Sequence, residues 1–338
     1  MKQFYLFIFI LFSLSAFSKQ QLGSLKVEEV LLKPRLRLSE PEQGGFEIGE
    51  SYLGLTYELD PYLKAVVSLG SLGLINTPSY FYNELSTSHV NFGFFEAYAE
   101  VHGLYGRLRM GLIPLGYGLN GGFRESELRL PRIQLLTRRV VGLRDYGLEY
   151  KIGEGRFYSQ FSIHNGETAS NIDGRIWLTG KWAYEGSRLH MGLVGQTGET
   201  TTASTVASTE TRAGFDASED NKIRLGGFFI EDHAGNFKSY VEYHFGEIRD
   251  EQNHTGQFAT GVLGFTHMWK KHIWFDLRVD AYDPSTDVDE NLFIETALAI
   301  SYLSPYMNSV VSLVLVKKEE QQLEIDNNEV MIAWKLSP

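Results

Sequence analysis

Residues 272–283 read HIWFDLRVDAYD. Successive side chains of an extended chain point to opposite faces, so this segment has two unlike sides. The apolar side consists of Ile273, Phe275, Leu277 and Val279, and the charged side consists of Asp276, Arg278 and Asp280. Strict alternation of this kind predicts a β-strand whose two faces meet different surroundings.

The alternation with a period of two continues along most of the chain. In residues 95–101, for example, Phe95, Ala97, Ala99 and Val101 form the apolar side. The pattern predicts sixteen strands, an even number as expected for a bacterial barrel, although Pro34 interrupts the first of them. These strands are residues 26–39, 46–59, 62–72, 90–101, 104–116, 144–152, 156–165, 173–184, 187–197, 220–231, 236–248, 256–268, 272–283, 291–303, 306–318 and 327–337.

The connections between these strands alternate in length. Short turns such as Asp60-Pro61 and His102-Gly103 are followed by longer segments, which include residues 73–89, 117–143, 198–219 and 284–290. Outer-membrane barrels have short turns at one end and long loops at the other. A soluble β-sandwich or solenoid of hairpins is the competing structure, but its strands are usually only about 5–6 residues long. The sequence therefore predicts an all-β, 16-stranded antiparallel transmembrane β-barrel with an inward-folded third loop.

Aromatic residues near the predicted strand ends agree with a membrane barrel. Tyrosine and tryptophan gather at membrane–water interfaces because their rings are amphipathic. The residues expected in such girdles are Tyr57, Tyr62, Tyr184, Trp269, Tyr302 and Trp334.

The N-terminus has the features of a secretory signal peptide. A short basic start precedes the apolar run FYLFIFILFSLSA at residues 4–16, and Ala16-Phe17-Ser18 is a small-x-small cleavage site. A transmembrane anchor is the alternative, but the run is shorter than the roughly 20 residues that a spanning helix needs. We expect residues 1–18 to be removed and residues 19–338 to form a single barrel domain.

The composition excludes several functional classes. The chain has 31 Lys and Arg against 42 Asp and Glu, a net charge of -11, which argues against nucleic acid as a partner. It has no cysteine and no motif for a metal, cofactor or enzymatic reaction, so we expect no enzyme and no cofactor. Two weaker alternatives are a cation site in the acidic cluster at residues 280–290 and a Ser/His hydrolase using His164 or His190.

The polar strand faces are expected to line an aqueous lumen, because sixteen strands enclose more space than side chains fill. Pairing across the turn at His102-Gly103 predicts Glu96 opposite Arg109 and Tyr98 opposite Arg107. These charges either line the path of a solute or form structural cross-strand ion pairs. The charged residues expected inside are Glu96, Glu100, Arg107, Arg109, Glu149, Lys151, Arg175, Lys181, Lys222, Arg224, Lys238, Glu242, Asp276, Arg278, Asp280 and Glu295.

The third long connection, residues 117–143, reads YGLNGGFRESELRLPRIQLLTRRVVGL. It is basic within an acidic chain and too apolar for a solvated tip, so folding against the inner wall would suit it. Arginine rings favour anions in channels, whereas an outer loop would use the same arginines on lipopolysaccharide phosphates or neighbouring acids. The basic residues concerned are Arg124, Arg129, Arg132, Arg138 and Arg139, with Arg144 at the following strand.

Three segments resemble the phosphate-selective porins of the O and P type: Gly106–Gly116 (GRLRMGLIPLG), Arg144–Tyr150 (RDYGLEY) and His164–Gly166 (HNG). The resemblance covers roughly residues 90–166 and includes Arg107, Arg109, Arg144 and Asp145. It implies a sixteen-stranded trimeric porin whose third loop folds into the pore. The chain departs from this family in its mixed rather than lysine-lined lumen and in its C-terminal sequence Trp334–Pro338, which does not end on an aromatic residue.

Together these features predict an outer-membrane porin for passive diffusion of small hydrophilic solutes, biased towards anions, phosphate being one candidate. The expected partners are outer-membrane lipid, lipopolysaccharide and two further copies of the chain in a homotrimer. The pore or constriction residues are Arg107, Arg109, Arg124, Arg129, Arg132, Arg138, Arg139, Arg144, Glu96 and Glu100. The alternative is a non-conducting barrel that acts as an adhesin, receptor or structural anchor.

Overall fold

The computed structural model describes most of the chain after residue 23. The described residues are 24–31, 34–39, 45–48, 51–71, 92–103, 105–119, 121, 128–137, 140–153, 156–166, 175–200, 221–249, 255–286, 291–305, 309–321 and 328–336. The predicted signal peptide, residues 1–18, lies outside this set.

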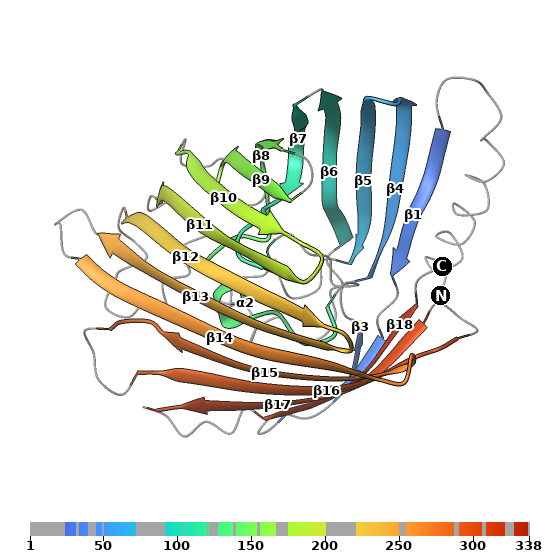
Figure 1. Ribbon diagram of the computed structural model, residues 1–338, viewed down its shortest axis with the longest axis vertical. Coiled ribbons are helices and arrows are strands. Elements are labelled where there is room, and N and C mark those ends of the chain that lie inside the picture. Colours follow the sequence, from blue (N-terminus) through green and yellow to red (C-terminus); the bar gives the residue numbers. More distant parts are fainter. Residues whose placement is uncertain are drawn as a thin grey trace.

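The described chain is built almost entirely of antiparallel strands (Figure 1). Their bounds are β1 (Ser24–Leu31), β2 (Pro34–Ser39), β3 (Gly45–Ile48), β4 (Ser51–Asp60), β5 (Leu63–Ser71), β6 (Phe92–Gly103), β7 (Gly106–Pro114), β8 (Arg144–Ile152), β9 (Phe157–His164), β10 (Trp177–Glu185), β11 (Leu189–Thr200), β12 (Asn221–Ala234), β13 (Phe237–Arg249), β14 (Thr255–Trp269), β15 (Ile273–Asp283), β16 (Phe293–Leu303), β17 (Ser309–Glu320) and β18 (Glu329–Leu336).

Strands β1 to β4 pair in two blocks, β1 with β4 and β2 with β3, in the order expected of a single hairpin. β1 pairs with β4 from Ser24↔Glu58 to Leu31↔Tyr52, and β2 pairs with β3 in the same series, from Pro34↔Ile48 to Arg37↔Gly45. Counted as one strand each, β1 with β2 and β3 with β4 bring the total to the sixteen strands predicted. β18 pairs with β2, so the pairings lead from the last strand back to the N-terminal strands, and the sheet is barrel-like. The strand predicted at residues 26–39 corresponds to β1 and β2, and residues 32–33 between them lie outside the described residues.

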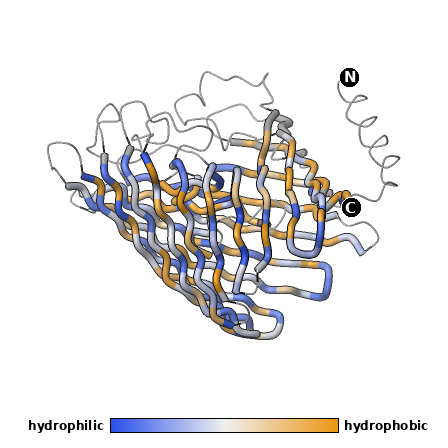
Figure 2. The backbone as a smooth tube through the Cα atoms, turned by 90° about the horizontal axis from the view of Figure 1, so that it is seen from above, coloured by the Kyte–Doolittle hydropathy of each residue, from blue (hydrophilic) through white to orange (hydrophobic). Residues whose placement is uncertain are grey.

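The two faces of the sheet have different surroundings. Large apolar side chains such as Leu263 and Phe265 are exposed on the outer face, whereas Val262 and Thr266, on the other face of the same strand, are buried. Figure 2 shows hydrophobic and hydrophilic residues alternating along the strands. Exposed aromatic residues lie beside the short turns, among them Tyr62, Trp269 and Tyr302. The outer face therefore has the apolar band and aromatic border expected of a barrel in lipid.

Short turns join the strands at one end, which we call the turn end. Between β12 and β13, Gly235 has a φ of +64°, a conformation that glycine adopts without steric cost. Between β6 and β7, Gly103 pairs with Gly106, so the turn lies at residues 104–105 rather than at the predicted His102-Gly103. The register follows from this shift: Arg109 faces Glu100, and Arg107 faces His102. The predicted pairs of Glu96 with Arg109 and Tyr98 with Arg107 are wrong.

The other end, the loop end, carries the long connections. The segment between β7 and β8 turns into the barrel, where the short helix α2 (Gln134–Thr137) lies within the curve of the strands (Figure 1). Leu119, Ile133, Leu135 and Val141 from this segment are buried with inner-face residues of the wall in one hydrophobic cluster. In the described part of the chain, no helix is long and apolar enough to cross a membrane.

Two predictions about the side of the sheet on which residues lie are wrong. In β6 the register against β5 shifts between Ser68↔Glu96 and Leu69↔Phe94, so Phe95 forms a β-bulge and is buried, stacked on Tyr52 at 4.9 Å. Lys222 and Arg224 were expected inside, but Ile223 is the buried residue between them and both basic side chains are exposed. They share the outer face with the apolar residues of β12 because they lie near its loop end.

Candidate lumen constriction and charged wall

Carboxylates on three strands of one wall hold the inward-folded segment. Glu242 on β13 accepts a hydrogen bond from the Leu119 amide at 2.9 Å. Asp280 on β15 accepts one from the Gln134 amide, and Glu295 on β16 accepts one from Gln134 Nε2 at 2.8 Å. These contacts satisfy the backbone of a buried segment that has little regular structure to satisfy itself.

Basic wall residues bind the carbonyl oxygens of the same segment. Lys181 Nζ on β10 donates to Gly118 O at 2.8 Å. Arg278 on β15 donates to Pro131 O and, through Nη2, to Arg132 O at 3.3 Å; Nη2 also contacts Glu295. The polar faces of β10, β13, β15 and β16 are therefore matched to the donors and acceptors of the loop.

Arg129 and Tyr117 of the segment differ in their polar contacts. Arg129 Nε and Nη2 donate to Asp276 Oδ2 and Oδ1 at 2.8 and 2.9 Å, and the guanidinium lies 4.3 Å from the Trp274 ring centre. Tyr117 is buried, and its hydroxyl has no hydrogen-bond partner among the described residues. Burial, together with the charge of Glu242, raises the pKa of the Tyr117 phenol well above its usual value.

A second charged group lies on β5–β8 towards the turn end. Arg109 Nε donates to Glu100 Oε2 at 2.6 Å, and Lys64 Nζ lies 2.9 Å from Glu100 Oε1. On the next strand, Glu149 Oε1 lies 3.4 Å from Arg107 Nη2 and 3.6 Å from Arg109 Nη1. We call these five residues the charged wall.

The charged wall presents its cations and hides its anions. The side chains of Lys64, Arg107 and Arg109 are 34%, 25% and 16% exposed, whereas those of Glu100 and Glu149 are 1% and 0% exposed. The same arrangement recurs on β12 and β13, where half-buried Lys238 pairs with buried Glu231. An ion in the lumen at this level therefore meets ammonium and guanidinium groups before it meets carboxylates.

The predicted constriction residues fall into separate groups in the structure. Arg107, Arg109 and Glu100 belong to the charged wall. Arg144 and Glu96 form a buried ion pair at 3.2 Å on β8 and β6, with the Arg144 guanidinium 3.4 Å from the Phe95 ring centre. Arg129 is half-buried against Asp276 and Arg132 is buried. Arg124, Arg138 and Arg139 lie outside the described residues.

Sequence reasoning did not identify the residues that hold the loop. The alternation placed Glu242, Asp280, Glu295 and Lys181 on the polar face, but it gave no sign that they contact residues 118–134. Lys64 was also missed, because its strand was read for its apolar face alone. Closer attention to that strand's polar side would have found Lys64, since its cross-strand partner is Glu100.

His164 takes part in a buried hydrogen-bond network that joins neighbouring strands. It lies buried on β9 with Nδ1 2.7 Å from Asp145 Oδ2 and Nε2 2.8 Å from Thr179 Oγ1, which links β8, β9 and β10. The Gly166 amide also donates to Asp145 Oδ2. Of the acidic cluster, Asp287, Asp289 and Glu290 lie outside the described residues, and Asp280 is used by the loop.

Comparison with known proteins identifies the fold. No protein-family model and no curated protein sequence matches the chain. Among solved structures, the trimer form of OmpT, an outer membrane protein of Vibrio cholerae, has a TM-score of 0.67 at 11% identity, covering 94% of this chain and 100% of that one. The anion-selective porin from Comamonas acidovorans has a TM-score of 0.63 at 14% identity, with coverage of 94% and 100%. The outer membrane channel DcaP of Acinetobacter baumannii has a TM-score of 0.65 at 9% identity, with coverage of 95% and 99%. The chain therefore has the fold of outer-membrane β-barrels of the porin type.

Proposed function

We propose that this chain is a passive outer-membrane channel for small hydrophilic solutes with a preference for anions. The observation that carries the proposal is the charged wall, where Lys64, Arg107 and Arg109 are exposed to the lumen and Glu100 and Glu149 are buried behind them. Basic side chains lining a pore favour anions. Two buried carboxylates against three cations also leave this part of the wall with a net positive charge.

The inward-folded loop supports a constriction. The loop lies against β10, β13, β15 and β16. In the order of strands around the sheet, β13 and β15 are far from β5 and β6 of the charged wall. Solutes would pass between the loop and the charged wall. The diffusion of hydrated solutes through such a gap needs no cofactor and no chemical step.

The location and assembly are part of the same proposal. The signal peptide predicted at residues 1–18 and the apolar outer face support export to the bacterial outer membrane. The anion-selective porin and the trimer form of OmpT among structures of similar fold support an anion preference and a homotrimer.

The test is the reversal potential of the purified full-length mature protein in planar bilayers under a potassium chloride gradient. The informative variant is Lys64→Gln/Arg107→Gln, which leaves Arg109 beside both carboxylates. A unit charge about 8 Å from an ion contributes roughly 0.5 kcal/mol in pure water and about 0.2 kcal/mol after screening by salt. Removing two such charges, which act oppositely on anion and cation, should lower the anion-to-cation permeability ratio about three- to fourfold.

The matched control is Lys222→Gln/Arg224→Gln, which removes the same charges from the outer face and should leave the ratio unchanged. An unchanged ratio in Lys64→Gln/Arg107→Gln, or a cation preference of the unmodified protein, would contradict the anion preference.

A non-conducting barrel that serves as an adhesin, receptor or anchor is the second candidate. One observation favours it: the inner faces of β16–β18 carry small apolar residues that are buried in a cluster with Leu130 of the loop. In this sector Leu130 of the loop packs directly on the wall. Absence of conductance from a correctly folded barrel would select this function.

A further inference from the structure

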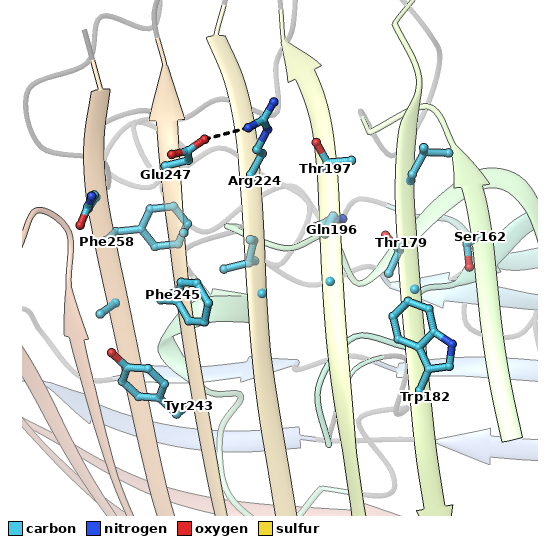
Figure 3. Close-up of a pocket in the computed structure, with 18 of the residues that line it drawn as sticks. Ser162, Thr179, Trp182, Gln196, Thr197, Arg224, Tyr243, Phe245, Glu247 and Phe258 are labelled. Carbon is cyan, nitrogen blue, oxygen red and sulfur yellow. Dashed lines mark hydrogen bonds and ion pairs between the residues drawn. The ribbon is translucent and has the colours of Figure 1, made fainter. Parts of the chain in front are cut away.

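The outer wall has a groove across β9–β14, on the lipid-facing side of the sheet (Figure 3). Its floor is a row of three cross-strand neighbours without side chains: Gly180 pairs with Gly195, and Gly195 pairs with Gly226. The row ends at an exposed phenylalanine on each side, Phe161 on β9 and Phe245 on β13. The groove has a volume of about 1090 Å³.

The packing of the barrel does not explain two of these glycines. A Cβ on Gly195 would meet one carbonyl oxygen at 3.7 Å, and a Cβ on Gly226 would meet the Phe245 ring at 3.6 Å, both ordinary contacts. By contrast, a Cβ on the neighbouring Gly192 or Gly227 would overlap backbone and ring atoms at 2.2–2.6 Å. Glycine weakens a strand, and it often marks a place where a ligand approaches closely. Gly195 and Gly226 thus leave room for something outside the protein.

The polarity of the groove changes along the strands. Towards the turn end its wall is apolar and aromatic, with exposed Trp182, Leu193, Phe228 and Tyr243 in the next row. Towards the loop end the next row is polar over β11–β14, with Thr197, Arg224, Glu247 and Gln257, and apolar over β9 and β10, with Ile163 and Leu178. Figure 3 shows Arg224 and Glu247 at one end of the groove and Tyr243 and Trp182 at the other.

The polar end carries two exposed cations, each beside one carboxylate. Arg224 is 69% exposed, and its Nη1 contacts Glu247 at 3.4 Å, the long end of the hydrogen-bond range. Lys222 lies one row further towards the loop end and is 67% exposed, and its Nζ lies 3.0 Å from Glu199 Oε1. A guanidinium carries five N–H donors and binds phosphate oxygens in pairs, so Arg224 has donors to spare.

We propose that this groove binds an anionic phospholipid, with one acyl chain over Gly195 and Gly226 and the headgroup phosphate at Arg224 and Lys222. An amphiphile of this class has the same order of polarity as the groove, with a charged end, an interfacial region and an apolar chain. The groove opens into the lipid layer that surrounds a membrane barrel, so the occupant needs no other route to it. The proposal depends on the fold and does not depend on whether the barrel conducts.

Trp182 provides the test, because its ring borders the groove. The full-length mature protein is reconstituted in phosphatidylcholine vesicles that contain increasing fractions of phosphatidylglycerol with brominated acyl chains, which quench nearby tryptophan. The Trp182 signal is the difference between the unmodified protein and Trp182→Phe. We expect this signal to be quenched at a lower lipid fraction by brominated phosphatidylglycerol than by brominated phosphatidylcholine.

Two variants define the groove. Gly195→Val/Gly226→Val fills the floor with residues that strands favour, and it should abolish the preferential quenching while the barrel keeps its heat-modifiable mobility in gels. Arg224→Gln should raise the fraction of phosphatidylglycerol needed for half-quenching by about fivefold, the effect of one basic side chain on an anionic lipid. Arg188→Gln, which removes an exposed arginine at the turn end, is the matched control and should change nothing.

Equal quenching by the two lipids, or quenching that the filled groove leaves intact, would overturn the proposal. The proposal would also be overturned if a second copy of the chain occupied the groove. In that case Gly195→Val/Gly226→Val would dissociate an oligomer, and the unmodified protein would show no preference between the lipids.

Discussion

Arg129 and Asp276 form a two-point contact between the inward-folded loop and the barrel wall: Nε and Nη2 of the arginine donate to the two carboxylate oxygens at 2.8 and 2.9 Å. The arginine belongs to the segment between β7 and β8, and the aspartate belongs to β15, 147 residues further along the chain. Thr266 Oγ1 donates to Asp276 Oδ1 at 2.6 Å, which fixes the carboxylate on the wall. The position of the loop inside the barrel therefore depends on a charged pair of defined geometry.

Replacing Asp276 by asparagine should loosen the loop. The variant keeps the shape of the side chain but removes its charge, and a hydrogen bond to a charged group is worth about 1.5–3 kcal/mol. We expect greater current fluctuation in single-channel recordings, because the loop samples more positions in the lumen. Asp232→Asn is the matched control, since it removes a similar two-point contact with Arg188 near the turn end. Equal noise in the two variants would contradict an anchoring role for Asp276.

Tyr117, which is buried, and Tyr158, which is half-buried, are two phenols that differ in their hydrogen bonding. The Tyr158 hydroxyl lies 3.5 Å from His190 Nε2, whereas the Tyr117 hydroxyl has no partner among the described residues. An unpaired buried hydroxyl costs about 1–3 kcal/mol, so Tyr117→Phe should leave the free energy of unfolding unchanged or raise it. Tyr158→Phe should not raise it. Urea unfolding in vesicles measures both, and a loss of more than about 1 kcal/mol in Tyr117→Phe would reveal a hydrogen bond through water.

The periodicity of the sequence was sufficient to predict the strands but not their exact register. Each of the sixteen predicted segments overlaps a strand, or the two halves of one, because alternation is a local property of residues such as Ile273–Asp283. Register depends on where a turn lies, and the glycine pair Gly103 and Gly106 moved the turn by two residues. The bulge at Phe95 left no mark in the pattern, since Phe94 and Phe95 are the same residue type.

The site was predictable only in part because it joins distant segments. The inward-folded loop was predicted from its mixture of arginines and aliphatic residues. Its anchors, such as Glu242 and Glu295, lie more than 100 residues away and share their polar face with many other charges. The rule that charges face the lumen also failed at Lys222 and Arg224, because strand ends extend beyond the apolar band and charged groups there can face outward.

Replacing Glu149 by glutamine should increase the anion preference of the channel. The carboxylate is buried behind Arg107 and Arg109, and Gln160 Nε2 donates to its Oε2 at 2.6 Å. Removing one negative charge from the charged wall changes the local charge in the opposite sense to Lys64→Gln/Arg107→Gln. The reversal potential should therefore move in the opposite direction, by roughly a factor of two in permeability ratio for one charge. Glu58→Gln, at an exposed pair with Lys26, is the control and should have a smaller effect. A shift towards cations in Glu149→Gln would contradict the proposed role of the charged wall.

Arg144 and Glu96 should be coupled in stability. The pair is buried, with Arg144 Nη2 3.2 Å from Glu96 Oε1 and the guanidinium over the Phe95 ring at 3.4 Å. Breaking a buried ion pair by removing one partner costs about 3–5 kcal/mol, because the remaining charge is left in a low-dielectric environment. We therefore expect Arg144→Met to lower the free energy of unfolding in urea by that amount. The double variant Arg144→Met/Glu96→Gln should recover most of the loss, since neither member of the pair is then left as an unpaired buried charge. Additive losses in the double-mutant cycle would show that the two side chains stabilise the barrel independently, and the bulge at Phe95 would then owe its position to ring packing against Tyr52 alone.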